Sequence, residues 1–150
     1  MCRVLIVAFG NPLRGDDGLA WRAAEELSQQ ISDPDVRILT THQLTPELSQ
    51  TVSQASSVIF LDAARSGVPG EIVLTSLLPE RPGSVFTHDF SPGGILNLSH
   101  NLYGRCPQAT LASVCGECFE HGDSVSRTVE AALPSLVARI IELVKAAGQV

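Results

Sequence analysis

Three aspartates and one histidine are the residues of this 150-residue chain best suited to do chemistry. Asp16 and Asp17 are adjacent in a glycine-rich loop, Asp62 follows an apolar run, and His88 precedes a Ser-Pro pair. Carboxylate oxygens and an imidazole nitrogen together suit a divalent ion such as zinc, nickel, iron or manganese. Three protein ligands with other positions open are typical of a metal that does catalysis or reads a substrate. The residues therefore suggest a divalent-metal site.

The same acids also have a structural interpretation. Either Asp16 or Asp17 stands where the N-cap of a helix is expected. Asp62, at the end of a buried strand, would need a cationic partner such as Arg14 or Arg65. Capping explains one of the two adjacent acids but not both, so the two interpretations stay open at this point.

A second cluster of potential ligands is Cys115-x-x-Cys118-x-x-His121, with Cys106 upstream. A Cys-x-x-Cys loop is typical of half a structural zinc site or of a redox pair, but two near cysteines are also often plain buried thiols. A complete zinc site usually has a second ligand pair at a defined spacing, which this sequence lacks. His42 has no evident partner in the sequence.

Other classes of site lack their motifs. The chain has no Gly-x-Ser-x-Gly nucleophile elbow, and the glycines at 10, 15 and 18 do not form the Gly-x-Gly-x-x-Gly pattern of nucleotide binding. The net charge of −6 argues against nucleic acid, whose binding depends on Lys and Arg neutralising phosphates. The charge instead favours a metal ion or a cationic peptide.

Strands and helices that alternate along the chain must position these residues. Apolar runs predict strands at 4–9, 36–39, 57–61, 70–75 and 109–114, the fourth of them at a sheet edge because Pro69 and Pro79 flank it. Helical spacing and start signals predict helices at 17–30, 45–54, 92–103 and from 124 or 126 onward, the last interrupted at Pro134.

This alternation predicts an α/β fold, a three-layer α/β/α sandwich with a mostly parallel sheet of about five strands, as a single domain over residues 1–150. Loops that follow parallel strands share one edge of such a sheet, and ligands bind there. The loop with Asp16 and Asp17, the segment at His42, Asp62, and the loop from Cys115 to His121 would therefore share this edge. His88 can join them if its loop returns along the same edge.

The sequence shows no signal peptide at its start and no run of about 20 apolar residues. We therefore expect a soluble, cytoplasmic protein without a membrane span. In that compartment the four cysteines are expected as thiols or metal ligands rather than disulfide partners.

One motif resembles that of a known family. The run 10–18, Gly-Asn-Pro-Leu-Arg-Gly-Asp-Asp-Gly, is similar to the signature of the hydrogenase maturation endopeptidases. These small proteins trim the carboxyl-terminal extension from a nickel-loaded NiFe-hydrogenase large subunit. Shorter matches at Asp62, at His88 before a helix, and at Ala131 to Pro134 extend the resemblance over most of the chain. It too implies a three-layer α/β/α fold.

The resemblance also implies roles for the site residues. Asp17, Asp62 and His88 would complete the coordination of nickel already seated in the large-subunit precursor, whose peptide bond beyond the last metal-binding motif is then cut. The nickel comes with the substrate, so the resting enzyme needs no cofactor, although zinc or cadmium is expected to fit the same ligands in vitro. Asp16 would orient the loop or act as a general base. The expected state is a monomer that binds this precursor.

Two segments depart from the family pattern. Residues 40–43 read Thr-Thr-His-Gln where other members often have an acid and glycines, so the role of that acid is absent or moved to His42. The Cys115-x-x-Cys118 loop is not a general family feature either. Two alternatives therefore remain: a metal-dependent hydrolase of a small substrate that uses the same acids, and a metal-binding or redox module centred on Cys115 and Cys118.

Overall fold

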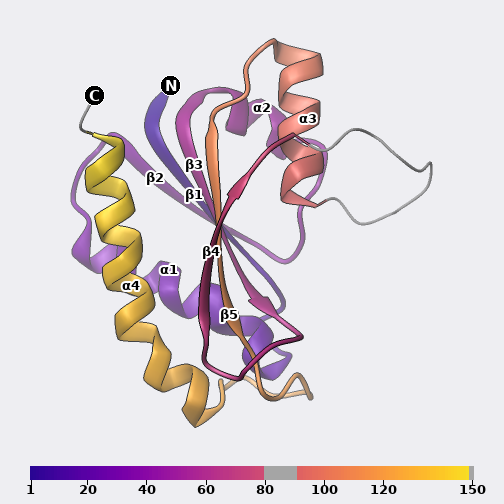
Figure 1. Cartoon of the computed structure of the whole chain (residues 1–150), viewed down its shortest axis with the longest axis vertical. Coiled ribbons are helices and arrows are strands. Elements are labelled where there is room, and N and C mark those ends of the chain that lie inside the picture. The colour runs from indigo at the N-terminus through magenta and orange to yellow at the C-terminus, as the bar shows by residue number, and fades with distance from the viewer. Residues whose placement is uncertain (80–90, 149–150) are drawn as a thin grey trace.

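Five strands and four helices alternate along the chain in the computed structural model, which describes residues 1–79 and 91–148 (Figure 1). In chain order the elements are β1 (Cys2–Phe9), the 3-10 turn η1 (Gly15–Gly18), α1 (Leu19–Gln30), β2 (Val36–Thr41), α2 (Leu48–Ser53), β3 (Ala55–Ala64), β4 (Ile72–Leu77), α3 (Pro92–Tyr103), β5 (Gln108–Cys115) and α4 (Arg127–Ala147).

The strands form one sheet in the order β2-β1-β3-β5-β4. The pairs β1–β2, β1–β3 and β3–β5 are parallel, and β4 runs antiparallel to β5 at one edge. The predicted α/β class, the mostly parallel sheet and the edge position of the fourth strand are therefore confirmed. Parallel neighbours need helical crossovers, which the alternating sequence supplies.

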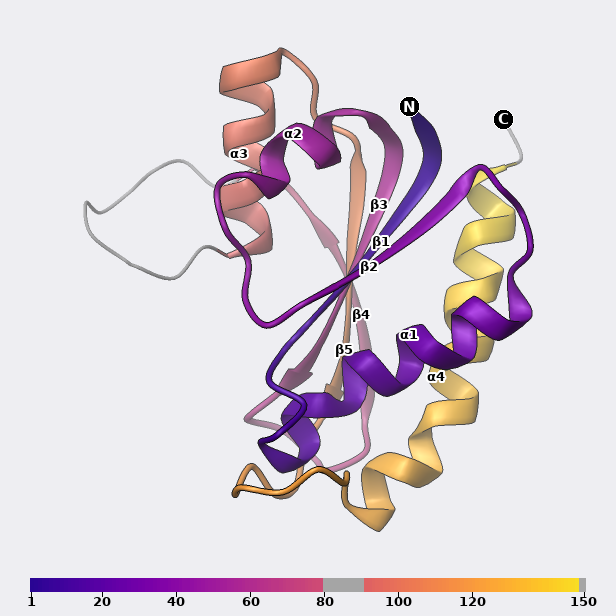
Figure 2. The same cartoon turned by 180° about the vertical axis from the view of Figure 1, so that it is seen from behind.

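Helices cover both faces of the sheet, which makes the fold a three-layer sandwich. Helices α1 and α4 pack on one face and α2 and α3 on the other, as the two opposite views show (Figures 1 and 2). Successive residues of β1 alternate between the two cores: Val4 and Ile6 face α1 and α4, while Leu5 and Val7 face α2 and α3. Burial on both faces explains why this strand is an unbroken apolar run.

Two helices, α3 and α4, begin where the sequence predicts, and in both a serine side chain caps the helix start. The Ser91 hydroxyl accepts a hydrogen bond from the Gly94 N–H (3.0 Å), and Pro92 takes the first helical position of α3, as predicted. Ser126 caps α4 in the same way, and this helix continues through Pro134 without a break. Of the two possibilities left open for the last helix, a start at 124 or at 126, the second is therefore correct.

Several predicted boundaries are wrong by two or more residues, and three of them have a clear physical reason. Helix α1 begins at Leu19 rather than residue 17 and has no side-chain cap, since the preceding acids lie in η1. Helix α2 begins at Leu48 because Thr45 and Pro46 form turns, in which their carbonyls accept the N–H groups of Leu48 and Ser49. Strand β3 does not end before Asp62 but continues to Ala64, since pairing with β5 extends along it.

None of the helices within the described ranges combines the length and the apolar character that a membrane crossing requires.

Candidate functional site at the carboxyl ends of β1 and β3

Asp17 is held close to the end of β1 by backbone geometry. Gly10, directly after the strand, has φ +146°, and a Cβ atom on it would lie 2.2 Å from the Asp17 carbonyl oxygen. Only glycine fits there, because its backbone accepts positive φ and it has no side chain to collide. The Asn11 N–H then donates a hydrogen bond to Oδ2 of Asp17 (2.7 Å). The loop therefore fixes this half-buried carboxylate at the edge of the sheet.

Asp62 lies on β3, the neighbour of β1, and faces β5. Its register partner on β5 is Ser113, whose hydroxyl donates a hydrogen bond to Oδ1 of Asp62 (2.5 Å). Burial raises the pKa of the Asp62 carboxyl, the nearby charge of Asp17 raises it further, and the Ser113 hydrogen bond partly opposes the increase. The carboxylates of Asp17, in the turn after β1, and of Asp62, on the neighbouring strand β3, are thus near enough for the Asp17 charge to act on Asp62.

No positive side chain in the described parts of the chain forms an ion pair with Asp17 or Asp62. The ion pairs found there join Arg3 to Asp33 and Asp35, and Arg22 to Glu130. Arg65, a predicted partner of Asp62, packs instead over the ring of Phe119, 4.3 Å from its centroid. The structural interpretation of Asp62 as half of an ion pair therefore has no support among these residues.

Asp16 has a different environment from its neighbour. Its side chain is fully buried and accepts hydrogen bonds from the N–H groups of Glu117 (2.7 Å), Cys118 (2.9 Å) and Ser126 (2.6 Å), and from the Ser126 hydroxyl (2.8 Å). Burial alone would raise the pKa of Asp16, but the hydrogen bonds from Ser126, Cys118 and Glu117 outweigh it and lower the pKa. Of the two roles predicted for Asp16, these contacts favour orienting the loop over acting as a base.

The two candidate histidines differ in what the structure says of them. His88 lies outside the described residues, so its predicted role stays a prediction. His42 is exposed just beyond β2, and its ring meets Trp21 edge-on at 5.4 Å between centroids. Trp21 in turn donates its indole N–H to the Gly10 carbonyl (2.9 Å). The partner of His42 is therefore an aromatic residue of α1, which the sequence did not reveal.

The cysteine cluster has no metal-like geometry in the described residues. Cys115 is buried at the end of β5 and Cys118 is exposed in the following loop, and both thiols are free. Within residues 1–79 and 91–148, no group of three or more His, Cys, Asp or Glu side chains is arranged to hold a metal ion. The described part of the candidate site is thus the carboxylate pair Asp17 and Asp62.

Sequence reasoning missed Ser113, the hydrogen-bond donor to Asp62. The available signal was a small polar residue near the carboxyl end of the mostly apolar strand at 109–114. Its significance depends on the β3–β5 register, which sequence alone does not fix.

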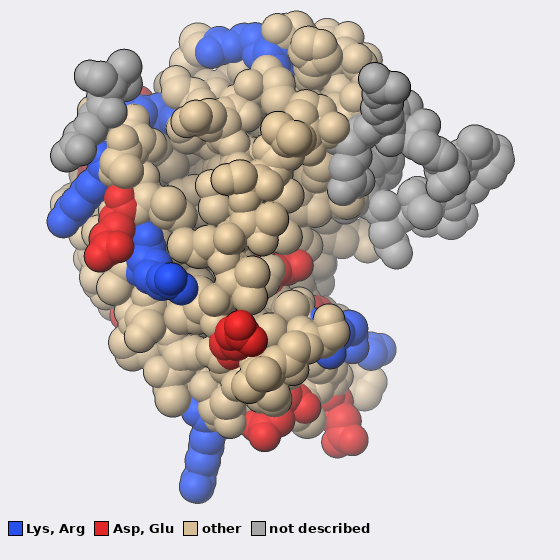
Figure 3. Space-filling view, viewed as in Figure 1, with Lys and Arg blue, Asp and Glu red and all other residues tan. Residues whose placement is uncertain are grey.

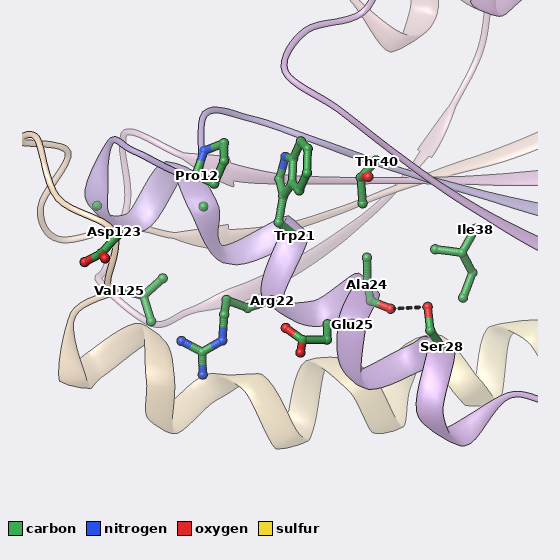
Figure 4. A pocket seen from close by; sticks show the side chains of 12 residues that line it. Pro12, Trp21, Arg22, Ala24, Glu25, Ser28, Ile38, Thr40, Asp123 and Val125 are labelled. Atoms are coloured by element: carbon green, nitrogen blue, oxygen red, sulfur yellow. Dashed lines mark hydrogen bonds between the residues drawn. The ribbon is translucent and has the colours of Figure 1, made fainter.

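A cavity of about 370 Å³ lies beside this edge, between α1 and β2 (Figure 4). Trp21, Arg22 and Glu25 of α1 line it together with Ile38 and Thr40 of β2. Neither Asp17 nor Asp62 lines this cavity. The cavity is therefore separate from the carboxylate pair.

Comparison with known proteins gave matches among solved structures. No family model matches the chain, and no curated protein matches its sequence. The hydrogenase maturating endopeptidase HybD from E. coli superposes with a TM-score of 0.80 at 25% identity, over 97% of this chain and 94% of that one. The NiFe-hydrogenase maturation protease HycI from Thermococcus kodakarensis KOD1 gives 0.78 at 23%, over 95% and 92%.

A hydrogenase 2 maturation peptidase from Thaumarchaeota archaeon SCGC_AB-539-E09 gives a TM-score of 0.71 at 24% identity, over 95% of this chain and 98% of that one. At these identities the two archaeal matches speak for the fold. The likeness to HybD spans nearly the full length of both chains, and the loop 10–18 carries the family's motif. In both its fold and its loop motif, this chain is similar to the hydrogenase maturation endopeptidases.

Proposed function

We propose that the chain is a hydrolase, an endopeptidase that removes the C-terminal extension from a nickel-loaded NiFe-hydrogenase large-subunit precursor. The observation that carries the proposal is the likeness to HybD, named a hydrogenase maturating endopeptidase, over 97% of this chain. The pair Asp17 and Asp62 supports it with suitable chemistry. The cytoplasmic location and monomeric state expected from the sequence are part of the same proposal.

In this proposal nickel is part of the substrate, and the carboxylates recognise it. The Asp17 charge raises the pKa of Asp62, and a divalent ion between the two carboxylates would relieve that repulsion and favour the charged form of Asp62. By family resemblance His88 would be the third ligand. The bound nickel would hold the scissile carbonyl in place and polarise either it or an attacking water.

Trimming of a purified precursor tests the function. We expect the protein to remove the extension from the nickel-loaded large subunit and to leave the nickel-free form intact, as measured by a mass loss at the carboxyl end. If the unmodified protein leaves the nickel-loaded precursor whole, the proposed function is wrong.

Asp62→Ala tests the site, with Asp35→Ala as the matched control. Asp35 is an exposed acid before β2, at the opposite end of the sheet. We expect Asp62→Ala to abolish trimming with its circular dichroism unchanged, and Asp35→Ala to trim normally. Full trimming by a folded Asp62→Ala protein would exclude Asp62 from the site.

Replacing both Cys115 and Cys118 by Ala separates this proposal from a cysteine-centred module. Trimming should survive the double change, because neither thiol belongs to the carboxylate pair. Total loss of trimming in a folded variant would favour the metal-binding or redox module.

A further inference from the structure

Among residues 1–79 and 91–148, no strand pairs with the outer edge of β4. In the described residues β4 pairs only with β5, and its sequence, Ile-Val-Leu-Thr-Ser-Leu, contains no charge and no proline. Edge strands usually carry charges, prolines or bulges that prevent pairing with another chain. The opposite edge strand, β2, has the exposed Arg37 within it. In Figure 3 the centre of the face with β4 in front is largely uncharged.

The register shows which backbone groups of β4 point outward. The Cys115 N–H donates to the Glu71 carbonyl (2.9 Å), which marks this pair as a hydrogen-bonded position of the antiparallel ladder. Such positions alternate along the strand, so Val73 faces β5 whereas Leu74 and Ser76 direct N–H and C=O away from it. The side chains of Val73 and Leu74 are 41% and 36% exposed. An incoming strand would find both hydrogen-bonding groups and apolar contacts.

This edge is continuous with the candidate site. Asp62 pairs with Ser113, and Ser113 pairs with Val73, so the three residues form one row across β3, β5 and β4. A strand added outside β4 would lie three strand spacings from β3, about 14 Å. An extended peptide covers that distance in about four or five residues.

We propose that the outer edge of β4 binds the C-terminal extension of the substrate as an added strand, starting about four or five residues beyond the scissile bond. The inference rests on the proposed function, because that function supplies an extended peptide at Asp62. Strand addition gives main-chain affinity for many sequences, and Val73 and Leu74 add a preference for apolar residues. Once the nickel end is bound, the extension is tethered beside β4, which favours it over a free second copy of the chain.

The variant Leu74→Pro tests the proposal, with Leu74→Val as its control. Proline removes one outward N–H, and an edge strand tolerates it where that N–H faces solvent. Two nickel-loaded precursors are compared, one with its full extension and one with an extension of three residues. We expect Leu74→Pro to lower kcat/KM about tenfold for the full extension only, since one lost hydrogen bond corresponds to about that factor. Leu74→Val keeps the outward N–H and an apolar side chain, so its loss of kcat/KM for the full extension should be much smaller than that of Leu74→Pro.

If folded Leu74→Pro trims the full-length extension as fast as Leu74→Val does, strand addition is wrong, while the proposed function stays intact. Absence of trimming by the unmodified protein would instead reject the function.

Amide hydrogen exchange of the unmodified protein gives a readout that needs no variant. A synthetic extension peptide should slow exchange at Leu74 and Ser76, and unchanged exchange there would also overturn the proposal. A dimer in sedimentation that Leu74→Pro dissociates would assign the edge to a second copy instead.

Discussion

The carboxyl groups of Asp16 and Asp62 differ in the direction of their pKa shift because their surroundings differ. Asp16 is fully buried with four hydrogen-bond donors around it, and its pKa is lowered. Asp62 has one donor, Ser113, and its pKa is raised by burial and by Asp17. A carboxylate with its hydrogen bonds satisfied stabilises the fold, whereas one that is desolvated and repelled by a like charge is available for a cation.

We predict that Asp62→Asn stabilises the protein at neutral pH but not in acid. The pKa of Asp62 is higher in the folded chain than in the unfolded chain, where it is about 3.9. Its contribution to stability is therefore full below the unfolded pKa and is lost as pH rises through the folded pKa. Asparagine carries no charge and keeps an oxygen acceptor for Ser113. Thermal unfolding from pH 3 to 8 should show a Tm advantage of the variant that grows with pH.

The matched control is Asp123→Asn, an exposed acid outside the ion pairs of the described residues, in which no such Tm advantage is expected. An Asp62→Asn protein that is less stable than the unmodified one at pH 8 would mean that the Asp62 charge is stabilised in the fold.

At the scale of elements, the loops after β1 and β5 form one unit although 100 residues separate them in the chain. The Gly15 N–H donates to the Gly122 carbonyl (3.0 Å), the Asp16 N–H to the Cys118 carbonyl (2.8 Å), and the Gly122 N–H to the Leu13 carbonyl (2.9 Å). The Asp16 carboxylate adds its bonds to the start of α4. The two loops lie side by side at the same end of the sheet (Figure 2).

We predict that Asp16→Ala destabilises the protein by at least about 3 kcal/mol. The substitution removes the charged acceptor of the N–H groups of Glu117, Cys118 and Ser126, and each partly buried hydrogen bond to a charged group is worth about 1.5–3 kcal/mol. Urea denaturation measures the loss. The exposed Asp123, in the same loop region, provides the control, since Asp123→Ala should change stability by less than about 0.5 kcal/mol. A loss below about 1 kcal/mol for Asp16→Ala would show that these loops do not depend on the carboxylate.

At the scale of the whole molecule, the sheet separates two apolar cores that are built by different helices. Ile140 of α4 is fully buried on one face, and Ile95 of α3 is fully buried on the other. The strands contribute alternate residues to both cores, so the sheet is the only layer common to them. Mutations in the two cores share no direct contact across it.

We therefore predict that Ile95→Val and Ile140→Val act additively. Each removes one buried methyl group and should cost about 0.5–1.5 kcal/mol, and the double variant should lose the sum within about 0.5 kcal/mol. Urea denaturation of the two single variants and the double variant forms the required cycle. A coupling above about 1 kcal/mol would mean that the sheet transmits strain between the cores. Leu133 and Val137, one helical turn apart on α4 and in the same core, serve as a positive control for coupling.

The sequence by itself determined the fold class and most elements, because those depend on local patterns. An apolar run such as 4–8 has few options other than a strand buried on both faces, and Ser91 with Pro92 marks a helix start within four residues. The same locality explains the error at Thr45 and Pro46, where an equally good start signal forms turns instead. The family motif at 10–18 also lies within one short segment.

Only the tertiary structure decided the surroundings of each aspartate. Asp16 and Asp17 are neighbours in sequence, and nothing local distinguishes them. The donors that bind Asp16 come from residues 117–126, and the hydroxyl that meets Asp62 comes from Ser113 on another strand. Burial, register and the pairing of distant loops set these environments, and they exist only once the strands lie side by side.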